Sequence, residues 1–167
     1  MKKTSIVIAV IVVILIIVSV TKTKNSDTVK IGFLTFPTGP VAIPGQMSVA
    51  AAQYAEDVVN KNGGINGKKL EVFIEDYAYD AKRAIPAYQA LKTKGANYII
   101  FEGSPAAGAV APLAKQNKDL LITGVTTLPS YTDGDPLTCR IGLTADNYGP
   151  AIAKYITDKK TNARVAF

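Results

Sequence analysis

Short apolar runs alternate with amphipathic helical segments along most of this chain, and this alternation limits the possible folds more than any other feature. Strand-like apolar runs are predicted at residues 29–34, 70–74, 98–101 and 120–123. Apolar residues at helical spacing follow the first three runs, at residues 47–58, 84–91 and 107–117. Strands that alternate with helices of this length form βαβ units and a parallel sheet. The sequence therefore predicts an α/β fold, a three-layer sandwich with a mostly parallel sheet.

The first predicted helix carries its apolar residues on one side, which predicts one buried face. These residues are Met47, Ala50, Ala51, Tyr54, Ala55 and Val58. Asn62-Gly63-Gly64 is expected to end the helix, because glycine turns through positive φ at little cost. Gly95 is expected to end the second helix, whose start Pro86 could kink.

Residues 1–27 differ from the rest of the chain. Met1-Lys2-Lys3 is a basic leader, and an apolar run follows at residues 6–20, which is the layout of a secretory signal. As a helix this run reaches about 22 Å, less than the roughly 30 Å of a bilayer core, and the flanking residues bring it close to that span. No A-x-A cleavage pattern is present, which favours an uncleaved membrane anchor over a cleaved signal. We expect an N-terminal hydrophobic helix and export to the cell surface or periplasm.

The positive charge of the chain does not indicate a nucleic-acid partner. The formal net charge is +6, and residues 1–27, with four lysines and one aspartate, contribute half of it. The remaining lysines and arginines are scattered, with no basic stripe interleaved with aromatic residues. We therefore expect no binding to nucleic acid.

The composition excludes much of enzyme chemistry. The chain has no histidine and one cysteine, which removes Ser-His and Cys-His nucleophile pairs, His-ligated zinc, disulfide frameworks and Cys-cluster metal sites. The lone Cys139 is predicted to be a small buried hydrophobe. We expect a protein that is not an enzyme and that uses no cofactor or metal.

Three motifs partly resemble a phosphate loop, a nucleophile elbow and a cation site, but none of them matches the full pattern. The glycines of residues 63–68 lack the spacing of a phosphate loop and follow a helix rather than a strand. Gly103-Ser104-Pro105 follows a strand, but the nucleophile-elbow pattern G-x-S-x-G is absent. Glu75, Asp76 and Asp80 form an acidic group at a strand end, where capping of the next helix by Asp80 is favoured over a divalent cation.

Four loops follow the carboxyl ends of the predicted strands, where ligands bind in open α/β folds. They span residues 35–45, 76–80, 102–106 and 124–131 and are rich in Gly, Pro, Ser, Thr and Tyr. Their hydroxyls and the amides of the following helices would suit a carboxylate or another small polar group. For any single loop, an ordinary polar connection explains the composition equally well.

Four ordered motifs carry a resemblance to a known family. They lie at residues 30–40, 60–70, 75–84 and 140–155, and they include Thr38-Gly39-Pro40 after the first strand and the helix-to-strand turn Asn60-Lys-Asn-Gly-Gly-Ile-Asn-Gly-Lys-Lys-Leu70. In this order the motifs resemble the leucine/isoleucine/valine-binding protein family, the type I periplasmic solute-binding proteins of ABC importers. The resemblance covers about Val29 to Phe167.

The resemblance implies a function and a site. Family members have two α/β lobes, joined by a hinge, that close over an amino acid or a similar small solute and deliver it to an ABC permease. Carried over by position, the residues that resemble the family's ligand-binding loops are Ser104, Pro105, Ala106, Thr126 and Thr127. The family's ligand serine aligns with Pro105, and an aromatic residue near the ligand aligns with Pro44. The family's two cysteines align near Tyr79 and Ser104, so that disulfide is not expected here.

The same resemblance divides the chain into three parts. Residues 1–27 are expected to be a signal sequence or an N-terminal membrane anchor, and residues 28–141 the first ligand-binding lobe. Residues 142–167 are expected to be the hinge crossover and the truncated start of a second lobe. The alternative is a membrane-anchored receptor domain of the same fold that senses a ligand and is not coupled to transport.

Overall fold

The computed structural model describes residues 28–159, except 125, 128 and 133. The predicted N-terminal helix, with its role as signal or anchor, and the predicted start of a second lobe at residues 160–167 lie outside this range. Within the described range, no helix is both long enough and apolar enough to cross a membrane.

Five parallel strands form one sheet in the order β2-β1-β3-β4-β5. They are β1 (Thr28–Thr35), β2 (Lys69–Asp76), β3 (Tyr98–Phe101), β4 (Leu120–Thr123) and β5 (Thr138–Arg140). The first four confirm the apolar runs of the sequence. The short β5 was not predicted, because three residues with one apolar side chain give no pattern of their own.

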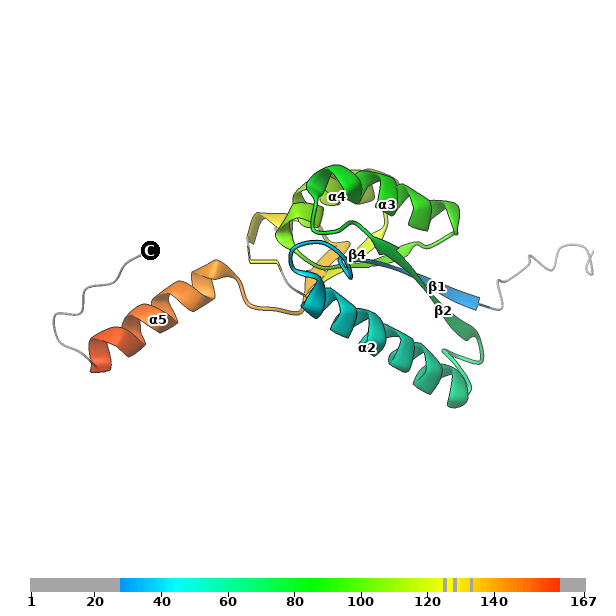
Figure 1. Ribbon diagram of the computed structural model, residues 1–167, viewed down its shortest axis with the longest axis horizontal. Coiled ribbons are helices and arrows are strands. Elements are labelled where there is room, and N and C mark those ends of the chain that lie inside the picture. Colours follow the sequence, from blue (N-terminus) through cyan, green and yellow to red (C-terminus); the bar gives the residue numbers. More distant parts are fainter. Residues whose placement is uncertain (1–27, 125, 128, 133, 160–167) are drawn as a thin grey trace, which may run out of the picture.

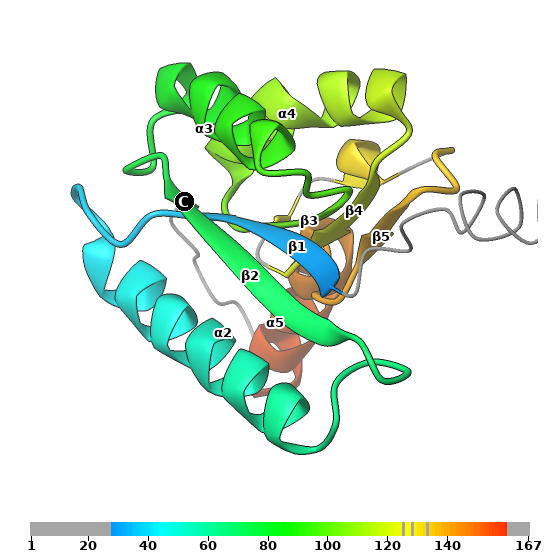
Figure 2. The same cartoon turned by 90° about the vertical axis from the view of Figure 1, so that its right-hand side faces the viewer.

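The helices are α2 (Ala42–Lys61), α3 (Ala81–Thr93), α4 (Ser104–Asn117) and α5 (Ala145–Lys159), with a 3₁₀ turn, η1 (Pro129–Tyr131), after β4. Figure 2 shows α3 and α4 on one face of the sheet and α2 on the other, which gives the predicted three layers. In Figure 1, α5 extends away from the sheet.

Local signals in the sequence set the ends of the helices. The carboxylate of Asp80 accepts a hydrogen bond from the backbone N–H of Lys82 (2.9 Å), so Asp80 caps α3 as predicted. Helix α2 ends at Lys61, directly before the turn at Gly63 and Gly64, which both have positive φ. Helix α3 runs through Pro86 as one element.

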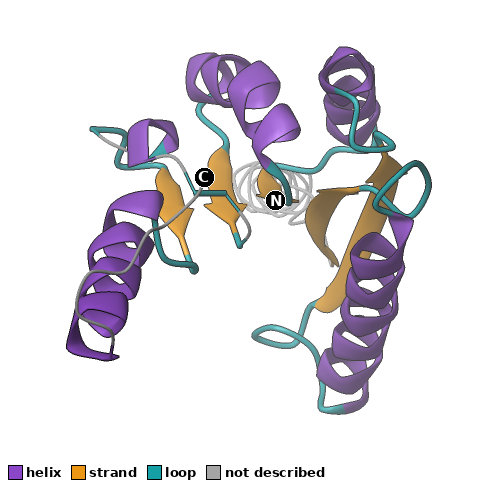
Figure 3. Cartoon of the chain, turned by 60° about the vertical axis from the view of Figure 1, so that its left-hand side comes forward, coloured by secondary structure: helices purple, strands orange, loops and turns teal. Residues whose placement is uncertain are grey.

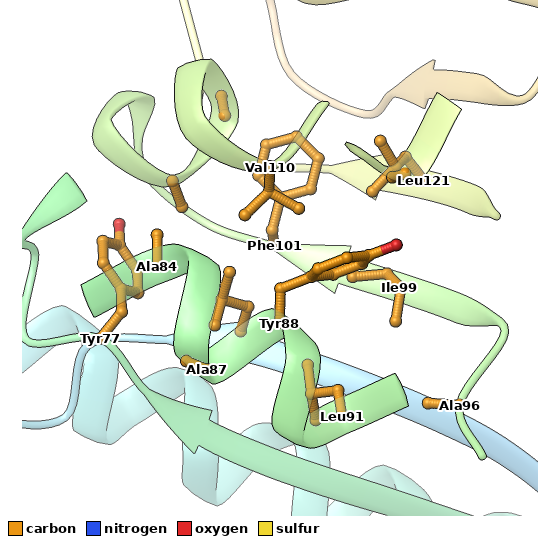
Figure 4. Packing of buried hydrophobic residues seen from close by; sticks show 14 of the residues in the cluster. Tyr77, Ala84, Ala87, Tyr88, Leu91, Ala96, Ile99, Phe101, Val110 and Leu121 are labelled. Atoms are coloured by element: carbon orange, nitrogen blue, oxygen red, sulfur yellow. The ribbon is translucent and has the colours of Figure 1, made fainter. Parts of the chain in front are cut away.

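The hydrophobic core lies between the sheet and helices α3 and α4 (Figure 4). Strand residues such as Ile99, Phe101 and Leu121 are fully buried, and small or aromatic helix residues such as Ala107 and Tyr88 cover them. Alanines on both helices allow close approach to the sheet, which is how a short sheet acquires a dense core.

The predicted buried face of the first helix is wrong. Met47 and Tyr54 are 68% and 73% exposed. The half-buried side of α2 instead includes Val49, Ala52 and Asn60. Asn60 binds both the N–H and the C=O of Leu70 (2.8 Å each), which ties the helix to β2. The apolar spacing correctly predicted a helix with an apolar side. In the structure, however, a different side of α2 packs on the sheet.

The predicted burial of Cys139 is also wrong, because this side chain is exposed. It lies in β5, the edge strand of the sheet, where successive side chains point to opposite faces. Thr138 takes the buried side, so Cys139 faces solvent.

Candidate functional site

The chain order of the sheet singles out one place for a ligand. From β1 the chain winds outward to β2 and then crosses back to β3, so β1 and β3 are neighbours whose following loops diverge to opposite faces. Such a switch point opens a crevice at the carboxyl ends of the two strands, and ligands in open α/β sheets bind there. Figure 3 shows the helices distributed over both sides of the sheet around this point.

Glu102 is the central residue at this switch point, directly after β3. Its carboxylate accepts one hydrogen bond from Thr35 Oγ1 at the end of β1 and one from Ser48 Oγ on α2, both at 2.8 Å. Its backbone N–H donates to the carbonyl of Leu34 (3.1 Å), which extends the pairing of β1 with β3. The side chain is therefore half-buried and fixed from two elements.

Three aromatic rings stand beside Glu102. Phe36 contacts Tyr77 and Tyr79 edge-on, with ring centroids 5.8 and 4.9 Å apart. The hydroxyl of Tyr77 donates to the carbonyl of Glu102 (2.6 Å). Burial raises the pKa of Tyr77 well above its ordinary value, and the nearby charges of Tyr79 and Glu102 raise it further. Tyr77 is thus a neutral, buried support for the loop after β3.

Close packing in this region requires a glycine at position 103. Gly103 has φ of +87°, and a Cβ there would lie 2.3 Å from Tyr77 Oη and 2.8 Å from a ring carbon of Tyr79. Ala78 and Tyr79 also have positive φ (50° and 60°), which is rare for residues with side chains. Such positions cost about 1–3 kcal/mol each and cluster at ligand clamps and active sites.

A pocket of about 250 Å³ opens among these residues. Its lining residues are Phe36, Val41, Pro44, Ser48, Tyr79, Glu102 and Gly103. They come from the loop after β1, the first turns of α2, and the loops after β2 and β3, all at one edge of the sheet. Most of the wall is apolar, and its polar side-chain groups are the carboxylate of Glu102 and the hydroxyls of Ser48 and Tyr79, as is typical of small-molecule sites.

Three of the predicted ligand residues lie at the start of α4, directly after the pocket residues Glu102 and Gly103 in the chain. Ser104 is the first residue of the helix, and Ser104 and Pro105 are half-buried. Ala106 is fully buried in the hydrophobic core. Ser104 and Pro105 are therefore the members of this group with accessible side chains.

The two predicted threonines follow the neighbouring strand β4 and differ in exposure. Thr126 is buried, its hydroxyl lies 2.8 Å from Thr123 Oγ1, and Arg140 donates to both its hydroxyl and its carbonyl. Thr127 is exposed, and its carbonyl accepts the N–H of Ala145 at the start of α5 (2.8 Å). The polar atoms of Thr126 thus hold the loop together, while Thr127 is exposed.

Glu102, Tyr79 and Ser48 were not singled out from the sequence. Glu102 and Tyr79 fall within loops predicted to face a ligand. The sequence prediction for the loop after the third strand relied on the neighbouring Gly103-Ser104 and not on Glu102. A usable signal was present: Glu102 is an acidic residue directly after a buried strand at the predicted carboxyl edge. Ser48 gave no signal, because its role depends on how α2 is rotated against the sheet.

The acidic residues near β2 have structural partners. Asp76 accepts hydrogen bonds from Thr38 Oγ1 and from the N–H of Ala78 (2.7 Å), and Asp80 caps α3. Within the described part of the chain, no group of three or more His, Cys, Asp or Glu residues is placed to hold a metal ion.

A doubly wound parallel sheet with a small, mostly apolar pocket at its switch point defines a ligand-binding α/β lobe. The periplasmic binding protein family matches the chain over residues 28–167. The chain belongs to this family, whose members are solute-binding proteins.

Curated relatives narrow the comparison. The chain is 35% identical over 147 residues to the leucine-, isoleucine-, valine-, threonine- and alanine-binding protein of Pseudomonas aeruginosa, with 84% of this chain and 38% of the relative covered. It is 32% identical over 146 residues to the Leu/Ile/Val-binding protein of Escherichia coli, covering 84% and 39%. The chain thus spans about two fifths of the length of these relatives, and the expected resemblance is confirmed.

Solved structures agree on the fold and differ in their ligands. A branched-chain amino acid transporter substrate-binding protein from Streptococcus pneumoniae in complex with isoleucine has a TM-score of 0.72 at 28% identity, covering 79% of this chain and 38% of that one. A solute-binding protein of an ABC transporter from Rhodopseudomonas palustris in complex with 3,4-dihydroxybenzoic acid has the same TM-score and identity, covering 80% and 37%. The fold is shared by proteins whose solutes differ widely.

Proposed function

We propose that this chain forms a ligand-binding lobe of an extracytoplasmic solute-binding protein of an ABC importer. Its solute is an amino acid or a similar small polar molecule, held between this lobe and a second one. The observation that carries the proposal is the pocket at the switch point of the sheet, in a chain that belongs to a family of solute-binding proteins. The lobe performs no chemistry on the solute and releases it to an ABC permease.

The geometry supports two kinds of contact to such a solute. The first turn of α4 begins at Ser104, where the positive end of the helix dipole favours a carboxylate. The Ser104 hydroxyl adds a donor at the same point. Thr127 lies after β4, the strand next to β3, and it is exposed. Its side chain would contact the solute from the loop after β4, while Ser104 contacts it from the loop after β3. Pro105, Ala106 and Thr126 shape and fix these two loops.

We also propose that the protein is exported and stays attached to the membrane through residues 1–27. The basic leader and the apolar run support export, and the missing A-x-A pattern supports retention. Sequencing the N-terminus of the mature protein tests this: an intact leader is expected, and a start near Asn25 would refute the anchor.

Calorimetric titration of the chain with L-leucine, L-isoleucine, L-valine, L-alanine and their amides tests the proposed function. We expect saturable binding of at least one member of the series. Ser104→Ala and Thr127→Val should each weaken that binding about 10- to 150-fold, the effect of losing one hydrogen bond to a charged group. Thr93→Val, at the far end of α3, is the matched control. Unchanged affinity in both site variants would refute the site.

A further inference from the structure

The pocket beside Glu102 has a chemical character that the proposed function leaves open. Phe36, Val41, Pro44 and Tyr79 line most of it, and among the described lining residues Glu102 alone is charged. We propose that this pocket receives a cationic group, an ammonium or a guanidinium, and that Glu102 selects solutes carrying one. The inference rests on the proposed function, because it names the solute class for the same edge of the sheet.

The carboxylate of Glu102 is oriented before any solute arrives. Thr35 donates to Oε2 and Ser48 donates to Oε1, so each oxygen keeps capacity to accept a further hydrogen bond. Both donors are neutral hydroxyls. Among the residues that the structure describes, no Lys or Arg forms an ion pair with this carboxylate. Hydroxyls reduce the cost of burying a carboxylate but do not neutralise it, so a cation is the complement that the site lacks.

The aromatic wall suits the same occupant. Phe36 and Tyr79 meet edge-on at 4.9 Å beside the carboxylate, and both line the pocket. A cation over an aromatic face gains electrostatic attraction that a neutral group does not. Tyr79 is presented by consecutive residues in the left-handed region, Ala78 and Tyr79, so an uncommon backbone conformation places this ring at the pocket.

Other occupants fit less well. The carboxylate of a solute would meet repulsion from Glu102 and would be drawn instead to the start of α4. A purely apolar group would bury the Glu102 charge further without offering it a partner, which is costly. A solute with a cation toward Glu102 and an acidic group toward Ser104 satisfies both ends of this edge.

A matched pair of small probes tests the charge requirement. 3-Methylbutan-1-amine and 3-methylbutan-1-ol share one apolar body and differ in whether the head group is cationic or neutral. We expect the amine, in titrations of the chain followed by NMR, to shift the backbone amide signals of Ser48 and Gly103 saturably at millimolar concentration. The alcohol should bind at least tenfold more weakly.

Two variants separate the role of Glu102 from general charge. Glu102→Gln keeps the shape and the hydroxyl partners and should reduce the preference for the amine to less than twofold. Asp57→Asn removes an exposed carboxylate on α2 outside the pocket and should leave the preference unchanged. Ser48→Ala removes one of the two hydroxyls that orient the carboxylate and should lower the preference about two- to fivefold. It provides a second measurement if Glu102→Gln does not fold.

The outcomes distinguish this inference from the proposed function. Equal binding of amine and alcohol, or a preference that survives Glu102→Gln, overturns the cation inference. So does saturable binding of an amino acid together with no binding of the amine, and in that case the proposed function stands. Binding of no solute at all, from either series, overturns both.

Discussion

The two faces of the sheet are covered in different ways. On one face, α3 and α4 bury side chains such as Ala84, Leu91 and Val110 completely. On the other, α2 leaves Met47 and Tyr54 mostly exposed. Helix α5, which extends away from the sheet, has no buried residue. All four helices have an apolar side, but only two of them place it on the core. An apolar stripe therefore shows that a helix has an apolar face, but it does not show that other residues of this chain bury that face.

The largest expected effect comes from the ion pair between the buried Asp119 and the partly exposed Lys92 on the α3-α4 face. The carboxylate of Asp119, 3% exposed, accepts hydrogen bonds from the Tyr88 hydroxyl and from Lys92 Nζ. Asp119→Ala leaves both donors without this partner and should lower the free energy of unfolding by about 3–5 kcal/mol. Urea denaturation measures it. Asp57→Ala, which removes an exposed pair with Lys61 on α2, should cost less than about 0.5 kcal/mol. Equal losses would contradict the difference between the two faces.

Truncation of one apolar residue on each face sharpens the comparison further. Leu91→Ala opens a cavity in the core and should cost about 2–5 kcal/mol. Met47→Ala removes a side chain that is mostly in solvent and should change the free energy of unfolding by less than about 0.5 kcal/mol. Comparable costs in urea denaturation would mean that α2 packs against something in solution.

Alkaline pH should lower the free energy of unfolding through Tyr88, which lies on the α3-α4 face. Burial, and then the hydrogen bond to Asp119, raise the pKa of Tyr88 from its ordinary value near 10 to about 12. The folded protein holds this proton more tightly than the unfolded chain, so the stabilisation is complete below about pH 10 and is lost as the pH rises toward 12. Urea denaturation at pH 9, 10, 11 and 12 measures the loss. Tyr88→Phe should reduce the slope without abolishing it, because the pKa of Tyr77 is also raised. An unchanged slope would contradict this assignment.

The smallest expected effect is on the α2 face. Tyr54→Lys places a charge where the side chain already meets solvent, and it should change the free energy of unfolding by less than about 0.5 kcal/mol while it raises solubility. Light scattering over a concentration series and urea denaturation measure the two effects. A large destabilisation would show that this stripe is covered by residues of the same chain.

Much of the fold could be predicted from the sequence, since it depends on local patterns. The bounds of β3 and β4 were predicted to the residue, and Asp80 and Gly63 act as expected. The orientation of α2 could not be predicted, because periodicity locates an apolar side and says nothing about which surface lies against it. Cys139 was misjudged for a related reason: burial in a strand depends on whether the strand is an edge.

The candidate site was predictable as a place and less so as a set of residues. The loops at the carboxyl edge were identified from the order of strands and helices alone. The orientation of the Glu102 carboxylate depends on hydrogen bonds from Thr35 and Ser48, which are 67 and 54 positions away in the chain. Such pairings arise from the register of β1 with β3 and from the docking of α2, and neither is written in a local pattern.

The exposure of Cys139 has a practical consequence. It is the single cysteine of the chain and lies on an accessible edge strand, so a maleimide dye would attach at one defined position without any engineered substitution. The next residue, Arg140, holds the backbone of the Thr126 loop. A fluorophore on this thiol would therefore sit one residue from a loop of the candidate site and could report solute binding as a change in its emission.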